Sequence, residues 1–134
     1  MAGALSEKLI PRLLERFPDR GLRIHDGTQP AVTFPAAHPD VGDLTIDDDD
    51  VELTISVGHL THGHFSSWDQ NAPQHDREEE VIAHVLSFLD AVFADEMVFW
   101  SADKAGGSHG RGDEPIVRHL GTRRFTWSGP LDGY

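Results

Sequence analysis

Residues 51–57, Val-Glu-Leu-Thr-Ile-Ser-Val, alternate strictly between apolar and polar side chains. Successive side chains of a strand point to opposite faces, so this pattern predicts a strand with one buried and one solvated face. Leu44 and Ile46 alternate with polar neighbours in the same way, and the four aspartates at 47–50 separate the two segments. Residues 43–57 therefore predict a hairpin, and a half-solvated strand is typical of an antiparallel sheet.

Two other segments show the spacing of an amphipathic helix. Residues 5–17 repeat leucine every four positions, although Pro11 falls inside the pattern and predicts a kink or a start near Ile10. Residues 76–94 carry a wide apolar stripe behind an acidic first turn, which suits the positive end of the helix dipole. The stripe of this longer helix contains Val81, Val85, Leu89 and Val92.

The C-terminal part of the chain contains shorter signals. The apolar run at 97–100 predicts a buried strand, and two more strands are expected at 116–120 and 124–128. Residues 105–112 contain four glycines, which predicts a flexible surface loop. Residues 129–134 are expected to form a tail.

The predicted fold class is α+β, with the whole chain, residues 1–134, forming a single domain. The expected architecture is an antiparallel-dominated sheet of about five to seven strands. We expect the N-terminal helix and the long helix at 76–94 to pack on one face of this sheet.

The charge balance excludes several classes of partner. The 134 residues include 11 Lys and Arg against 23 Asp and Glu, a formal net charge of −12 that repels nucleic-acid phosphates and anionic lipid surfaces. No apolar run reaches the roughly eighteen residues that a membrane-spanning helix needs. Cysteine is absent, which removes disulfides and thiolate metal sites. We expect a soluble, cytoplasmic protein that binds neither nucleic acid nor membrane.

Three of the nine histidines, His59, His62 and His64, fall within six residues after Gly58. If the strand continues beyond the glycine, His62 and His64 leave the same face and could share zinc or another divalent metal. His59 or Asp69 could then supply a further ligand. The alternative is that the histidines lie on the solvated face of a half-buried strand and bond to neighbours or water.

No catalytic set is complete in the sequence. His-Glu-x-x-His, a phosphate loop and a Gly-x-Ser-x-Gly elbow are all missing. A calcium loop starting at Asp47 would need glycine and glutamate where the chain has Glu52 and Gly58. Catalytic residues are therefore not assigned, and the sequence favours a protein that is not an enzyme.

A basic and aromatic group near the C-terminus is a candidate for partner binding. Arg123 and Arg124 accompany Phe125 and Trp127, and arginine and tryptophan are enriched at binding hot spots. Simple alternation gives another explanation, in which Phe125 and Trp127 face the core while Arg124 and Thr126 face water. Trp68, in a polar segment beside the histidines, either covers the edge of the core or contacts a partner.

A small acidic domain without a catalytic set is most simply a protein-binding module without a cofactor. Its acidic surface is complementary to a basic protein. One alternative is an enzyme or sensor that uses zinc or another divalent metal held by His59, His62 and His64. Another is an interaction that responds to pH through the same histidines.

Overall fold

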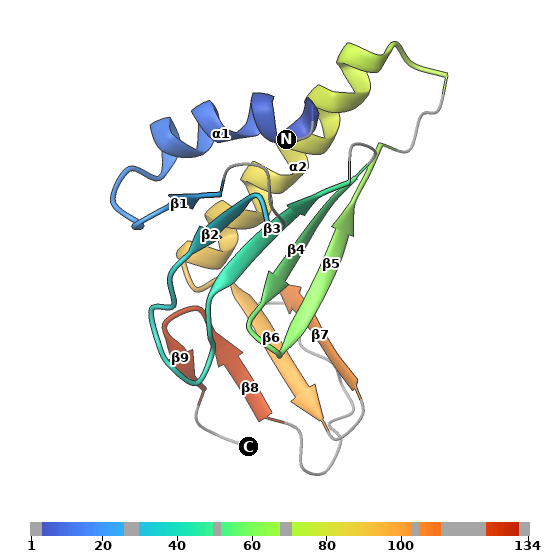
Figure 1. Cartoon of the computed structure of the whole chain (residues 1–134). Helices are drawn as coiled ribbons and strands as arrows, with labels where there is room; N and C mark the ends of the chain where they lie inside the picture. Colours follow the sequence, from blue (N-terminus) through green and yellow to red (C-terminus); the bar gives the residue numbers. More distant parts are fainter. Residues whose placement is uncertain are drawn as a thin grey trace.

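The computed structural model describes residues 4–25, 30–49, 52–67, 71–102, 105–110 and 123–131. Within these ranges the chain forms two helices and nine strands, and the strands pair into two antiparallel sheets (Figure 1). The α+β class and the antiparallel pairing predicted from the sequence are confirmed. The strands form two sheets, however, where one was expected.

The first sheet has five strands in sequential order, so each strand pairs with the next one along the chain. Its strands are β1 (Arg23–Ile24), β2 (Val32–Phe34), β3 (Leu44–Asp48), β4 (Leu53–Val57) and β5 (Thr61–Phe65). In β3 and β4 buried and half-buried residues alternate along the strand, as the sequence predicts. The buried residues other than Asp48 belong to the hydrophobic core, and the polar residues between them face outward.

The second sheet has the strand order β7-β6-β8-β9. Its strands are β6 (Met97–Ala102), β7 (Ala105–Gly110), β8 (Arg123–Thr126) and β9 (Gly129–Pro130). Two predictions are wrong here: residues 105–110 form a strand instead of a flexible loop, and residues 129–130 pair with β8 instead of belonging to a tail. Three predicted segments lie outside the described residues: the end of the loop at 111–112, the strand at 116–120 and the end of the tail at 132–134.

Close contacts explain the glycines of β7. A Cβ atom on Gly107 would lie 2.7 Å from the indole nitrogen of Trp100, the residue that pairs with Gly107 on β6. A Cβ atom on Gly106 would lie 2.1 Å from the carbonyl oxygen of Leu60, just before β5. Glycine is therefore required here for packing, although a glycine-rich composition by itself suggests flexibility.

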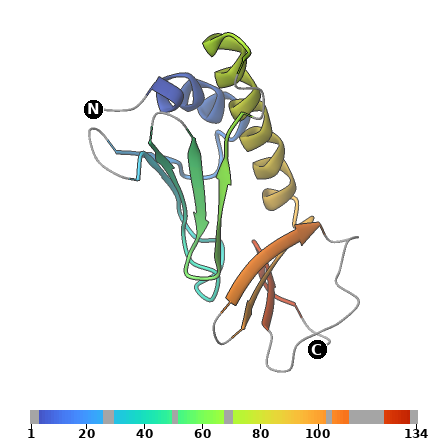
Figure 2. The same ribbon diagram turned by 90° about the vertical axis from the view of Figure 1, so that its right-hand side faces the viewer.

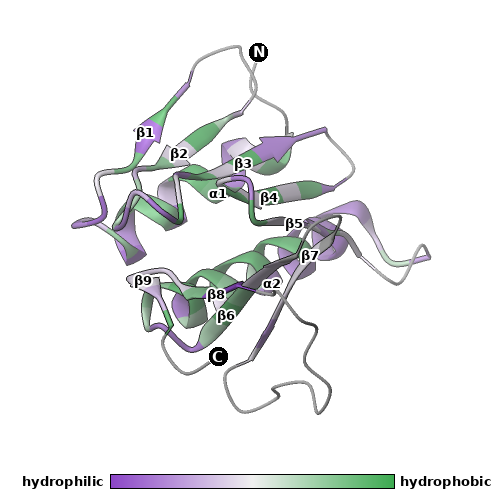
Figure 3. Cartoon of the chain, turned by 90° about the horizontal axis from the view of Figure 1, so that it is seen from below, coloured by the Kyte–Doolittle hydropathy of each residue, from purple (hydrophilic) through white to green (hydrophobic). Residues whose placement is uncertain are grey.

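Helix α1 (Ala4–Arg16) and helix α2 (Gln74–Phe93) lie on the inner side of the first sheet (Figure 2). Helix α1 begins at Ala4 and continues through the exposed Pro11, so the predicted start near Ile10 is wrong. The predicted apolar stripe of α2 is buried, and the helix is coloured hydrophobic along much of its length (Figure 3). It lies beside the first sheet and ends at the second (Figure 2). No helix in the described part of the chain is long and apolar enough to cross a membrane.

Phe93, the last residue of α2, joins these layers. Its ring centroid lies 5.0 Å from those of Phe17, just beyond α1, and Phe34, in β2. It lies 5.5 Å from that of Trp127, in the turn between β8 and β9. All three contacts are edge-to-face, the geometry that ring quadrupoles favour. One side chain thus contacts both sheets and the end of α1.

A buried carboxylate ties the β3–β4 hairpin to α1. Asp48 is 3% exposed, and its Oδ2 accepts a hydrogen bond of 2.7 Å from the backbone N–H of Ser6 in the first turn of α1. The first N–H groups of a helix have no partner inside the helix, and a carboxylate there also meets the positive end of the dipole. A residue of β3 therefore acts as an N-terminal cap for α1.

Asp48→Ala should lower the free energy of unfolding by about 2 kcal/mol, because it leaves a buried N–H without its charged acceptor. The matched control is Asp47→Ala, which changes the neighbouring residue on the outward side of β3 and should cost no more than about 1 kcal/mol. Urea denaturation of both variants measures the difference. Equal losses would contradict the capping role of Asp48.

Candidate functional site: the polar face of the first sheet

The outward side of the first sheet carries polar and charged side chains in two rows across β3, β4 and β5. The rows are Thr45–Ser56–His62 and Asp47–Thr54–His64, and Glu52 joins the second row through His64. We call these seven residues the polar face. None of them is buried, so the whole set is open to solvent or to a partner.

His62 and His64 lie on the same side of β5, as the sequence predicts, and both are exposed. Their ring centroids are 5.3 Å apart. The Nδ1 atom of His64 lies 3.1 Å from a carboxylate oxygen of Glu52 and 3.0 Å from the hydroxyl oxygen of Thr54. The sequence did not indicate these two neighbours of His64, because they depend on the register between β4 and β5.

Gly58 reverses the chain, so the expected continuation of one strand from β4 into the histidines is wrong. The N–H of Leu60 donates to the carbonyl of Val57 at 3.0 Å and closes the turn between β4 and β5. Gly58 has a φ of +51°, and its N–H donates to the carbonyl of Asp43 at 2.8 Å. A Cβ atom on Gly58 would lie 2.0 Å from the carbonyl oxygen of Val41. Glycine therefore sets the turn, and the turn sets the register of the polar face.

A small groove opens beside this turn. Its volume is about 350 Å³, and His59 and His62 line it together with Gly106 of β7. His59 thus shares the groove with His62, whereas His64 lies with His62 on the polar face. The complete lining is Ser56, Gly58, His59, Leu60, Thr61, His62 and Gly106.

The predicted metal site is not assembled within the residues that the structure describes. Among these residues, no three or more His, Cys, Asp or Glu side chains are grouped so that they could hold a metal ion. His62 and His64 offer two imidazoles, and zinc sites in proteins use at least three protein ligands. Asp69, the predicted further ligand, and Trp68, the predicted partner-binding residue, lie outside the described residues.

The C-terminal arginines differ in their exposure. Arg123 is exposed, and its guanidinium lies 5.1 Å from the ring centroid of Phe125. Phe125 and Trp127 are each 2% exposed, which confirms that they face the core. Arg124 and Thr126 are only 8% and 5% exposed, so the expectation that they face water is wrong, and a partner could not reach Arg124 without a change of structure.

The basic side chains of α1 form ion pairs within the protein. Three ion pairs join α1 to α2: Lys8–Glu78, Arg12–Glu79 and Arg16–Asp90. The hydrogen bond from Lys8 is the largest cause that lowers the pKa of Glu78, and the one from Arg12 does the same for the pKa of Glu79. These basic residues therefore offset three of the acidic side chains of α2.

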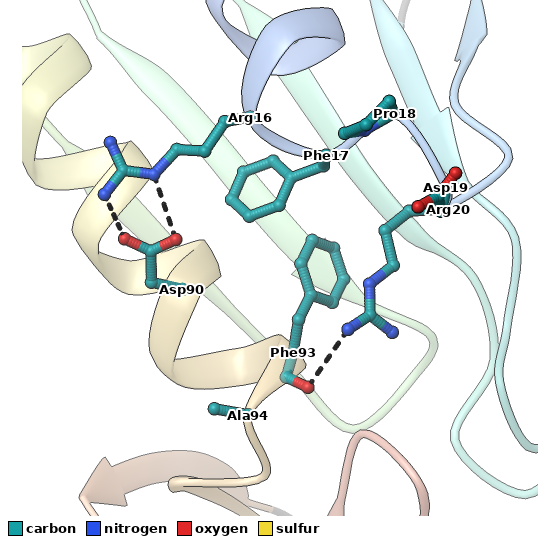
Figure 4. Close-up of a pocket in the computed structure, with 8 residues that line it drawn as sticks. All are labelled: Arg16, Phe17, Pro18, Asp19, Arg20, Asp90, Phe93 and Ala94. Carbon is teal, nitrogen blue, oxygen red and sulfur yellow. Dashed lines mark hydrogen bonds and ion pairs between the residues drawn. The ribbon is translucent and has the colours of Figure 1, made fainter.

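A second hollow, of about 600 Å³, lies where the two helices end (Figure 4). Its two arginines already bind other parts of the protein. Arg16 pairs with Asp90 of α2. Arg20 donates to the carbonyl of Phe93 at 3.3 Å, and its guanidinium lies 4.7 Å from the centroid of the Phe93 ring. These contacts hold the helix ends together, so we assign this hollow a role in packing.

The first sheet has almost no fixed positive charge. From residue 24 to residue 76 the sequence contains ten Asp and Glu, six His and no Lys or Arg. This stretch includes all of β2, β3, β4 and β5, and Arg23 lies in β1, at the opposite edge of the sheet from β5. The absence of Lys and Arg from this stretch can be read from the sequence, but the net charge of the whole chain does not reveal it.

No protein-family model matches this chain, and neither a curated protein nor a solved structure shows significant similarity to it. The fold class therefore rests on the structure alone. Function has to be argued from the chemistry of the polar face and of the groove beside it.

Gly58→Ala should lower the free energy of unfolding by about 2–4 kcal/mol, because the new methyl group meets a carbonyl oxygen and the backbone is left-handed. The control is Gly63→Ala in β5, where the new Cβ would lie 3.7 Å from Phe65, an ordinary contact. That variant should stay within about 1 kcal/mol of the original protein. Chemical denaturation measures both, and a mild effect of Gly58→Ala would refute the role of the turn.

Proposed function

We propose that the protein is a non-enzymatic binding module that takes a basic protein partner on its polar face. The observation that carries the proposal is the separation of charge between the helices and the first sheet. The basic residues of α1 pair with acidic residues of α2, whereas residues 24–76 carry ten acidic residues and no Lys or Arg. A surface whose fixed charges are all negative attracts a positively charged partner and speeds its association.

The accessibility of the polar face supports the proposal. His62 and His64 are exposed, and Asp47 and Glu52 are only half-buried. Glu52 lies 3.1 Å from the Nδ1 atom of His64, and Asp47 lies on the same outward side of the sheet. The carboxylates of this face are therefore within reach of a cationic partner.

Removing two charges from the polar face should weaken partner binding. The variant combines Asp47→Asn with Glu52→Gln, and the matched control combines Glu15→Gln with Asp19→Asn, which removes two exposed carboxylates near the end of α1. The polar-face variant should raise the Kd for a basic partner by about tenfold, whereas the control should change it by less than about threefold. The original protein, the polar-face variant and the control variant are each immobilised, and partners are captured from the native host at low and at high salt.

Salt should reduce the capture, because screening weakens contacts between exposed charges. Recovery of the same partner by all three proteins would show that the polar face is not the binding surface. Recovery of no partner at either salt concentration would overturn the proposed function.

Zinc provides a separate test of the metal alternative. Protein purified without a histidine tag should show no rise in Tm on addition of zinc, because two imidazoles make an incomplete site and a ligand stabilises only the state that it binds. A rise in Tm that disappears in the double variant His62→Ala, His64→Ala would favour a metal-dependent sensor or enzyme instead. Differential scanning calorimetry with and without zinc gives the answer.

A further inference from the structure

β5 is an edge strand of the first sheet, and β6 and β7 of the second sheet contact part of it. It is the last strand in the order β1-β2-β3-β4-β5, and all five of its residues pair with β4 on one side only. Its residues are half-buried or exposed along the whole strand, whereas β3 and β4 bury every second residue. Figure 1 places β5 at the right-hand edge of the sheet, and no described segment crosses in front of it when that edge faces the viewer in Figure 2.

The sequence of β5 lacks the usual devices that protect an edge strand. Natural proteins place lysine, proline, bulges or very short strands at sheet edges to prevent pairing with another chain. β1 and β9 are protected by their length of two residues each. β7 is long, but half of its six residues are glycine, which gives a paired strand few side chains to recognise. β5, Thr-His-Gly-His-Phe, has no lysine and no proline.

The two sides of this edge differ in chemistry. The outward side presents His62 and His64, with Glu52 in contact with His64. On the inner side, the ring of Phe65 lies 5.3 Å from that of Phe88 in α2, and both side chains are only partly buried. An added strand would therefore place alternate residues beside His62 and His64, with Glu52 in contact with His64, and beside the partly buried ring of Phe65.

We propose that β5 binds an extended segment of the partner as a sixth strand, with Lys or Arg on the outward side and apolar residues on the inner side. Backbone hydrogen bonds to β5 would supply affinity, and the two rows of side chains would supply specificity. Leu60, just before β5, lies against Gly106 of β7, and β5 itself contacts both β6 and β7, so the segment would pair only with the part of β5 that the second sheet leaves free. This inference rests on the proposed function and names the form in which the basic partner is recognised.

Three synthetic peptides of about seven residues, the length of one strand, test the inference. The first alternates lysine and valine, the second has proline in place of the central valine, and the third has glutamate in place of every lysine. The proline peptide keeps the charge but cannot pair along its full length. We expect the proline peptide to bind at least about tenfold more weakly than the first, and the glutamate peptide to show no binding. Fluorescence anisotropy of labelled peptides measures each Kd.

The outcomes separate strand addition from simple charge attraction. Equal affinity of the lysine–valine and proline peptides would overturn strand addition and leave the proposed function standing. Failure of both cationic peptides to bind would overturn strand addition, and the proposed function would still be tested by the capture of a partner. Amide hydrogen exchange adds a second readout: the lysine–valine peptide should slow exchange in β5 and leave α1 unchanged, and equal exchange with and without peptide would count against the inference.

A substitution at His62 tests the same edge by changing the protein instead of the peptide. Its side chain is exposed, as is that of His84 in α2, so His62→Lys and the matched control His84→Lys should both fold. A lysine at residue 62 is the device by which natural edge strands repel a further strand, and it also repels a cationic segment. His62→Lys should weaken binding of the lysine–valine peptide at least about fivefold, whereas His84→Lys should bind within about twofold of the original protein. Equal binding by both variants would place the peptide elsewhere.

Discussion

The contact on which the rest of the structure depends is the packing of aromatic rings around Phe93. Helix α2 ends there, and the ring meets Phe17, Phe34 and Trp127. These neighbours come from the end of α1, from the first sheet and from the turn between β8 and β9 of the second sheet. Aromatic rings bury large areas and add a preference for edge-to-face geometry. The two sheets, which do not share a strand, thus both pack against one helix end.

The same helices decide where the charge of the molecule is displayed. Burial of the leucine stripe of α1 turns its basic residues toward α2, where Lys8, Arg12 and Arg16 meet acidic side chains. Exposed ion pairs of this kind add little stability individually. Their larger effect is on the charge of the surface, because they place the cations of α1 beside carboxylates of α2. The net charge of −12 is therefore not spread evenly, and the first sheet carries much of it.

Regular patterns could be read from the sequence, and contacts between distant residues could not. Alternation predicted β3 and β4, and it predicted that His62 and His64 share a side of β5. Two predictions that rested on glycine were wrong. Composition does not distinguish a flexible loop from a strand such as β7, in which Trp100 covers Gly107, and it does not distinguish a break within a strand from the turn at Gly58. Likewise, the pairing of Glu52 with His64 and the capping of α1 by Asp48 depend on register and on tertiary packing. A single sequence contains no record of either.

The composition of the first sheet is hard to explain by folding alone. Solvated positions of a strand accept lysine readily, and about four Lys or Arg would be expected between residues 24 and 76 from the overall content of the chain. Their absence leaves carboxylates to repel one another, which opposes the compact state. An edge strand without lysine also increases the risk of unwanted pairing. Both features weaken the isolated protein, and both favour the uptake of a cationic strand, so a binding role for β5 accounts for them together.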